Sequence, residues 1–163
     1  MTIDITLNTE QINKLDLSPA TTAIEKILQT GAIANSEQQI SFQINYDRPE
    51  EDPRELSEID EVRLWFIRLD TVYPWLPFLL NWQNGELARY AAMLVPHEFH
   101  PRSHEIQYNP QALELFIVQK IFVLTDWLNN QGIPSKSKLK AMALTFGIEM
   151  DDAFFDLIST NPV

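Results

Sequence analysis

Three histidines, His97, His100 and His104, lie within one short segment of the chain together with Glu98 and Glu105. Neutral imidazoles and carboxylates are ligands that zinc and similar ions accept, so this cluster could hold a metal. The same segment contains a proline and a serine, which are typical of an exposed connection. We therefore favour a solvated loop with no bound metal, and a small metal-dependent enzyme built on these histidines is the alternative.

The acidic segment from Asp47 to Glu61 is the second place where side chains could do chemistry. Paired carboxylates can act as general acid and base, but a catalytic carboxyl group needs a cleft that shifts its pKa. This segment is polar and contains Pro49 and Pro53, which favours an extended, solvated loop at its start. The better functional interpretation is an acidic strip that binds a basic partner. In the alternative, the charge only keeps the protein in solution.

Several classes of protein are excluded or disfavoured by composition. The chain has no cysteine, so it can form neither disulfides nor thiolate metal sites. It contains no G-x-G-x-x-G, Walker-type, G-x-S-x-G or H-E-x-x-H motif. Its 23 acidic residues outnumber 12 Lys and Arg, and a net charge of -11 repels nucleic acid. We expect a protein without enzyme activity or cofactor, which binds another protein and no nucleic acid.

The amino-terminal residues MTIDITLNTEQ lack the features of a secretory signal or a transit peptide, so we expect a cytoplasmic protein. The most apolar stretch, residues 112–128, is interrupted by Glu114, Lys120 and Asp126. A membrane-spanning helix needs about 20 mostly apolar residues. The stretch therefore predicts a buried helix and no membrane insertion.

The run RLWFIRLDTVYPWLPFLLNW, residues 63–82, combines many aromatic side chains with Arg63, Arg68 and Asp70. Core packing is the default for most of these aromatic residues. Arg, Trp and Tyr are also the types that dominate the binding energy of protein interfaces. Part of the run, with Trp75 and Trp82, is therefore a candidate surface for a partner.

Apolar residues alternate with polar ones over residues 3–7 and 40–46, which predicts two half-buried strands. Between them, Ser18 and Pro19 begin a helix that Gly31 ends. A second helix follows the acidic loop, with Ser57 as its N-cap and Pro74 after its last residue. Pro77 is expected to keep the residue before it extended.

Residues 87–95 fit either a helix or a strand, and we favour a strand toward the end, over 93–99, paired with 105–108. A long apolar helix opens at Asn109 and Pro110, and two shorter helices are expected over 135–146 and 151–158.

These elements predict a single α+β domain over residues 1–163. In it, a small, mostly antiparallel sheet of about four strands packs against several helices, including the long apolar helix as the central one. The alternative is a mainly α fold with one minor hairpin.

Three segments of the chain resemble the chlororespiratory reduction six family of cyanobacteria and chloroplasts. They are DPRELSEIDEVRLWFIRLDTVYPWLPFLLNW, GELARYAAMLVPHEF and IQYNPQALELFIVQKIFVLTDWL. The resemblance implies an assembly factor, or chaperone, for the photosynthetic NAD(P)H dehydrogenase-like complex, acting on the iron-sulfur subunit of its peripheral arm. It also implies the cytoplasm of a cyanobacterium, or the stroma for plastid relatives. A permanent accessory subunit of the complex is the alternative.

The candidate partner-binding residues are those in the matching segments that are polar or aromatic beyond what a core requires. They are Arg54, Arg63, Arg68, Asp70, Tyr73, Trp75, Trp82, Glu86, Arg89, Tyr90 and His97.

Overall fold

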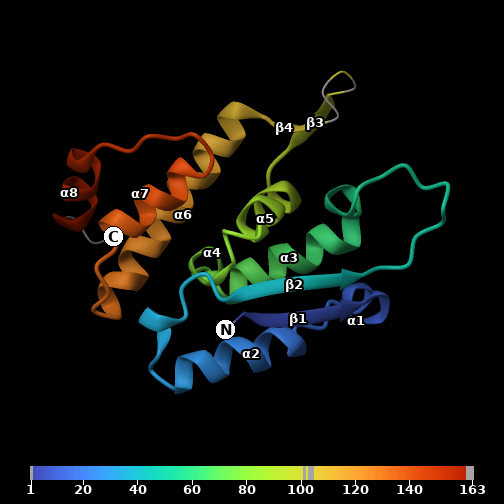
Figure 1. Cartoon of the computed structure of the whole chain (residues 1–163), viewed down its shortest axis with the longest axis horizontal. Coiled ribbons are helices and arrows are strands. Elements are labelled where there is room, and N and C mark those ends of the chain that lie inside the picture. The colour runs from blue at the N-terminus through green and yellow to red at the C-terminus, as the bar shows by residue number, and fades with distance from the viewer. Residues whose placement is uncertain (1, 101, 103–104, 161–163) are drawn as a thin grey trace. The chain divides into compact units, whose positions relative to one another are not determined.

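The computed structural model describes residues 2–100, 102 and 105–160, and the chain divides into two compact units, Met1–Pro96 and His97–Val163. Figure 1 follows the first unit from blue to yellow-green and the second from yellow to red. Each unit has a two-stranded sheet and helices of its own. The expectation of a single domain over the whole chain stays a prediction.

The sheet of the first unit pairs β1 (Ile3–Asn8) with β2 (Ile40–Asn45) in parallel, with Ile3 opposite Ile40. Because side chains alternate along a strand, one face of this sheet carries the apolar residues and the other the polar ones. Ile5 and Phe42 are buried on the apolar face. The opposite face carries the exposed side chains of Asp4, Thr6, Asn8, Gln43 and Asn45.

The helices of the first unit follow from local capping signals. They are α1 (Thr9–Asn13), α2 (Ser18–Gln29), α3 (Asp60–Val72), α4 (Leu76–Leu79) and α5 (Glu86–Leu94), with short 3-10 turns at Ile33–Asn35 and Leu56–Glu58. The side chain of Asn8 accepts a hydrogen bond from Gln11 N, which caps α1. Gly85 precedes α5 with a φ of 74°, a left-handed conformation that glycine adopts without steric cost.

Aromatic side chains of α3 form the centre of the first unit. The ring of Phe42 lies edge-on to Trp65 at 5.9 Å and to Phe66 at 5.4 Å, and Phe66 also contacts Tyr90 of α5 at 6.3 Å. Edge-to-face pairs at these distances stabilise a core beyond the burial of their area. The inner face of α3 is therefore fixed against the apolar face of the sheet.

The second unit consists of an antiparallel hairpin and three helices. The hairpin pairs β3 (His97–His100) with β4 (Glu105–Tyr108), and α6 (Pro110–Asn130), α7 (Lys136–Leu144) and α8 (Asp152–Thr160) follow. Both α7 and α8 contact α6. Among the described helices, α6 included, none is both long enough and apolar enough to cross a membrane.

The structure confirms an α+β protein, but the expected sheet of about four mostly antiparallel strands is wrong. The described strands form two separate sheets, and β1 and β2 run parallel. A period-two pattern does not encode strand direction, whereas the intervening helix α2 is the kind of crossover that parallel strands need. The long apolar helix α6 belongs to the second unit, and its central place over the sheet is not confirmed.

Three local predictions are also corrected. The expected strand over 93–99 gives way to α5, which continues to Leu94, and the strand itself begins at His97. Leu76 is helical, because Pro77 lies in the first turn of α4, where a missing N–H leaves no bond unmade. The N-cap of α3 is Ile59, and Ser57 lies in the preceding 3-10 turn.

The two faces of α3 predict opposite effects of mutation. Phe66 is 1% exposed, so Phe66→Ala should lower the free energy of unfolding by about 3–5 kcal/mol. Leu64 is 50% exposed, so Leu64→Ala should change it by less than about 1 kcal/mol. Urea unfolding followed by circular dichroism measures both values. Equal losses for the two variants would contradict this orientation of α3.

Candidate functional site

The edge of β2 away from β1 is closed by a parallel bridge between Ile40 and Leu80 and by two charged side chains of α5. Phe42 N donates a hydrogen bond to Glu86 Oε2 at 3.1 Å, and Arg89 Nη1 donates to Phe42 O at 2.6 Å. Glu86 and Arg89 also form an ion pair at 3.2 Å, and Ser41 Oγ donates to Glu86 Oε1. The two side chains thus bond the backbone of Phe42 as a neighbouring strand would. Glu86 is 4% exposed, so it is not available to a partner.

Tyr90 and Asp70 form a second polar contact between α5 and α3. The Tyr90 hydroxyl donates a hydrogen bond to Asp70 Oδ1. Burial, with the negative charge of Asp70 and this hydrogen bond, raises the pKa of Tyr90 well above its ordinary value. The Tyr90 hydroxyl therefore stays protonated at neutral pH, and its hydrogen bond to Asp70 connects α5 to α3.

The aromatic candidates beyond α3 also have structural contacts. Tyr73 is buried and lies edge-on to the half-buried Trp75 at 6.0 Å. Trp82 is half-buried, and its indole Nε1 donates to Pro77 O at 2.6 Å. A ring contact thus connects Tyr73 and Trp75, and a backbone hydrogen bond holds Trp82.

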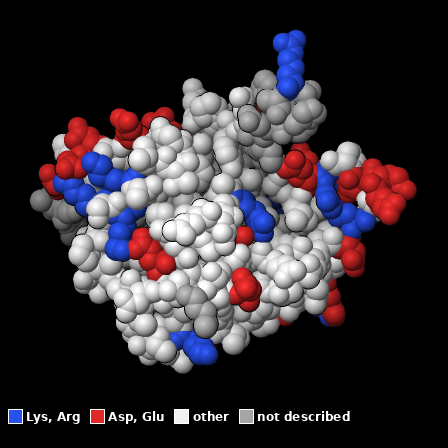
Figure 2. Space-filling model, viewed as in Figure 1, with Lys and Arg blue, Asp and Glu red and all other residues white. Residues whose placement is uncertain are grey.

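Arg54 is exposed in the acidic loop between β2 and α3. Its guanidinium meets the Asp52 carboxylate at 2.7 Å and lowers the pKa of Asp52 to about 2. It also lies in the field of Glu61 and Asp60 at the start of α3. Figure 2 shows acidic side chains gathered over this loop. Arg54 therefore reduces local repulsion between acids.

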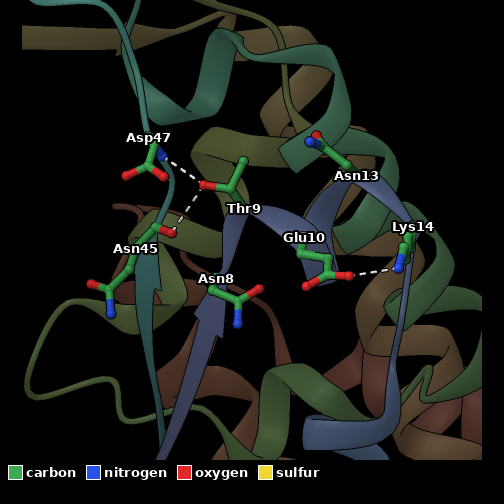
Figure 3. A pocket seen from close by; sticks show the side chains of 7 residues that line it. All are labelled: Asn8, Thr9, Glu10, Asn13, Lys14, Asn45 and Asp47. Carbon is green, nitrogen blue, oxygen red and sulfur yellow. Dashed lines mark hydrogen bonds and ion pairs between the residues drawn. The ribbon is translucent and has the colours of Figure 1, made fainter.

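An open pocket of about 610 Å³ lies where β1 and β2 end, and Figure 3 shows its lining. Thr9 Oγ1 accepts from Asp47 N at 2.7 Å and donates to Asn45 O, while Glu10 pairs with Lys14 at 2.6 Å. These polar groups tie the strand ends to α1. None of the lining side chains is buried, so the pocket lacks a desolvated group that would position a ligand.

The histidine cluster is only partly described. His97 is half-buried and pairs with Tyr108 across the β3–β4 ladder. Among the residues whose side chains the structure describes, which leave out those of His100 and Glu105, no three His, Asp or Glu gather as metal ligands. His104 lies outside the described residues as well, so neither the expected solvated loop nor the alternative metal site on the three histidines is tested.

Two candidates remain on an exposed surface, the outer face of α3. Arg68 is exposed and Arg63 is half-buried at the edge of this face. Neither guanidinium forms a hydrogen bond or ion pair with a described residue. Three large apolar side chains lie beside them: Leu64 is 50% exposed, Ile67 47% and Val72 48%. We call the surface formed by Arg63, Leu64, Ile67, Arg68, Thr71 and Val72 the α3 outer face.

Sequence reasoning missed the three apolar members of the α3 outer face. One apolar stripe is predicted by helical spacing over Val62, Trp65, Phe66, Leu69, Val72 and Tyr73. The structure buries all of these residues except Val72, which is 48% exposed, so that part of the prediction is wrong. Residues on the opposite side of the same helix turn must then face away from the core. Leu64 and Ile67 have this phase, so the signal was present in the sequence.

Fold and surface together define a small α+β protein that presents an apolar helix face flanked by two arginines. The chain matches the family described as Chlororespiratory reduction 6 over residues 7–157 and belongs to that family. No solved structure matches the chain. The family name connects the protein to chlororespiration and to the NAD(P)H dehydrogenase-like complex.

The bonds to Phe42 predict the effect of removing Glu86. Glu86→Ala leaves Phe42 N and Ser41 Oγ without their acceptor and should destabilise the protein by about 1–3 kcal/mol. Glu61→Ala, an exposed glutamate at the start of α3, is the matched control and should cost less than about 0.5 kcal/mol. Urea unfolding at neutral pH measures both. A loss of stability for Glu86→Ala no larger than that for the control would contradict the role of Glu86 in holding β2.

The raised pKa of Tyr90 predicts a loss of stability in alkali. Below the ordinary tyrosine pKa of about 10, both folded and unfolded chains hold the proton, and the contribution of Tyr90 is complete. Above it the unfolded chain loses the proton first, so stability falls with pH. The difference in unfolding free energy between wild type and Tyr90→Phe should shrink from about pH 9 to pH 11. A constant difference over this range would contradict the buried pair.

Proposed function

We propose that this protein is a non-enzymatic assembly factor of the photosynthetic NAD(P)H dehydrogenase-like complex. It binds the iron-sulfur subunit of the peripheral arm while that subunit matures. Membership of the Chlororespiratory reduction 6 family is the observation that carries the proposal. The α3 outer face supports it, because an exposed apolar helix face with arginines has the residue types that bind other proteins.

The chemistry of the chain favours holding the subunit over supplying its clusters. Iron-sulfur clusters are bound by cysteine thiolates, and this chain has no cysteine. We propose that the protein covers a surface of the immature subunit, keeps water and wrong partners from it, and leaves when the subunit docks. The proposed place of action is the cytoplasm of a cyanobacterium, with the stroma as the equivalent in plastid relatives.

An affinity capture of the tagged full chain from a cyanobacterial extract tests this function, with bound proteins identified and the complex sized. We expect the iron-sulfur subunit in a small complex that lacks the membrane arm. Recovery of the entire mature complex would favour a permanent accessory subunit. Recovery of no dehydrogenase subunit would overturn the proposal, and metal analysis of the purified protein would then test the histidine cluster.

A further inference from the structure

We infer that the α3 outer face docks an amphipathic helix of the partner, one whose apolar stripe is flanked by carboxylates. The inference deepens the proposed function and rests on it for the identity of the partner. The face belongs entirely to α3, whose other side is fixed by Trp65 and Phe66 in the core. The α3 outer face is therefore a rigid surface, and binding to it costs little conformational entropy on the side of this protein.

The spacing of the exposed residues is that of a helix-packing seam. Leu64, Ile67 and Thr71 are separated by three and then four positions, the interval of the apolar positions in a two-helix seam. Arg63 and Arg68 occupy the positions that flank such a seam on its two sides. In partner helices, these flanking positions carry the opposite charge.

The same residues also form two ridges with a groove between them. Arg63, Ile67 and Thr71 lie four residues apart along one ridge, and Leu64, Arg68 and Val72 along the other. Ridges of this kind accept a ridge of a second helix in the groove between them. An extended strand has no such complementary surface, which favours a helix as the occupant.

The two arginines of the α3 outer face indicate that the occupant carries carboxylates. Three other cations of the first unit pair with a carboxylate, Lys14 with Glu10, Arg54 with Asp52 and Arg89 with Glu86, whereas Lys26 and Arg48 pair with no described carboxylate. Arg63 and Arg68 have no such partner in the described part of the chain, although the protein carries a net charge of -11. A partner carboxylate on each side of the seam would complete both pairs.

A second copy of this chain is a poorer occupant. In an antiparallel pair of α3 helices, the flanking positions would set Arg63 and Arg68 toward Asp70 and Glu61 of the other copy. Asp70 already accepts the Tyr90 hydroxyl, and Glu61 already lies in the field of Arg54.

Site-specific crosslinking tests the occupant. A photo-crosslinking amino acid replaces Ile67 in the full chain, expressed in a cyanobacterium, and the crosslinked peptide is sequenced. The same amino acid at Leu115 of α6, which is 73% exposed, is the matched control. We expect position 67 alone to capture a helical segment with apolar residues at intervals of three and four and Asp or Glu beside them. A basic or extended segment, a second copy of the chain, or no product at position 67 would overturn the inference.

Charge exchange tests the two arginines with the captured partner. The double variant Arg63→Glu, Arg68→Glu should raise the Kd for the partner at least about tenfold at low salt. It should leave the urea midpoint of unfolding unchanged. Changing the captured carboxylates to lysine should restore most of the affinity. Lys26→Glu on α2, an exposed lysine outside the face, is the control and should alter the Kd less than about threefold. An unchanged Kd for the double variant, or no restoration, would also overturn the inference.

The two experiments separate this inference from the proposed function. If the captured helix belongs to a protein other than the iron-sulfur subunit, the docking surface stands and the proposed function fails. If the iron-sulfur subunit binds equally well to wild type and to the double variant, the proposed function stands and the docking surface fails.

Discussion

A two-stranded parallel sheet cannot be stable alone, and the first unit depends on what is built around Phe42 of β2. The backbone of Phe42 is bonded by Glu86 and Arg89, and its ring lies between Trp65 and Phe66. One residue thus connects the sheet to α3 and to α5. Polar bonds fix the edge of the strand, and aromatic contacts fix its buried face, so the helices take the part that further strands play in larger sheets.

This arrangement divides the polar candidate residues on α3 and α5 into two groups. One group holds helices to one another or to β2 through hydrogen bonds and an ion pair within the fold. It consists of Glu86, Arg89, Asp70 and Tyr90. Arg63 and Arg68 contribute nothing comparable to the fold, and they lie beside apolar residues that gain nothing from exposure. Residues that do not serve stability are the ones best placed to serve binding.

Sequence periodicity located most elements because burial of one face imposes a period. The alternation at Ile5 and Phe42 predicted their strands, and the spacing of Trp65 and Leu69 predicted α3 and its inner face. Strand direction was not accessible, because alternation is the same in parallel and antiparallel sheets. The site was predicted only in part: a polar residue in a distinctive segment, such as Glu86, gives no sign in the sequence that it is buried against a strand edge.

The outer edge of β1 in the first unit is paired with no described strand and carries no side-chain bonds like those of Glu86 and Arg89 to β2. The register of β1 with β2 directs the backbone groups of Asp4 and Thr6 away from β2, toward the open edge. Such an edge is a template on which chains can add strands and aggregate. Asp4 places an exposed charge near the start of this edge, and β1 is only six residues long. Both features are devices by which natural sheets resist unwanted growth, so the amino-terminal strand combines a role in folding with protection against self-association.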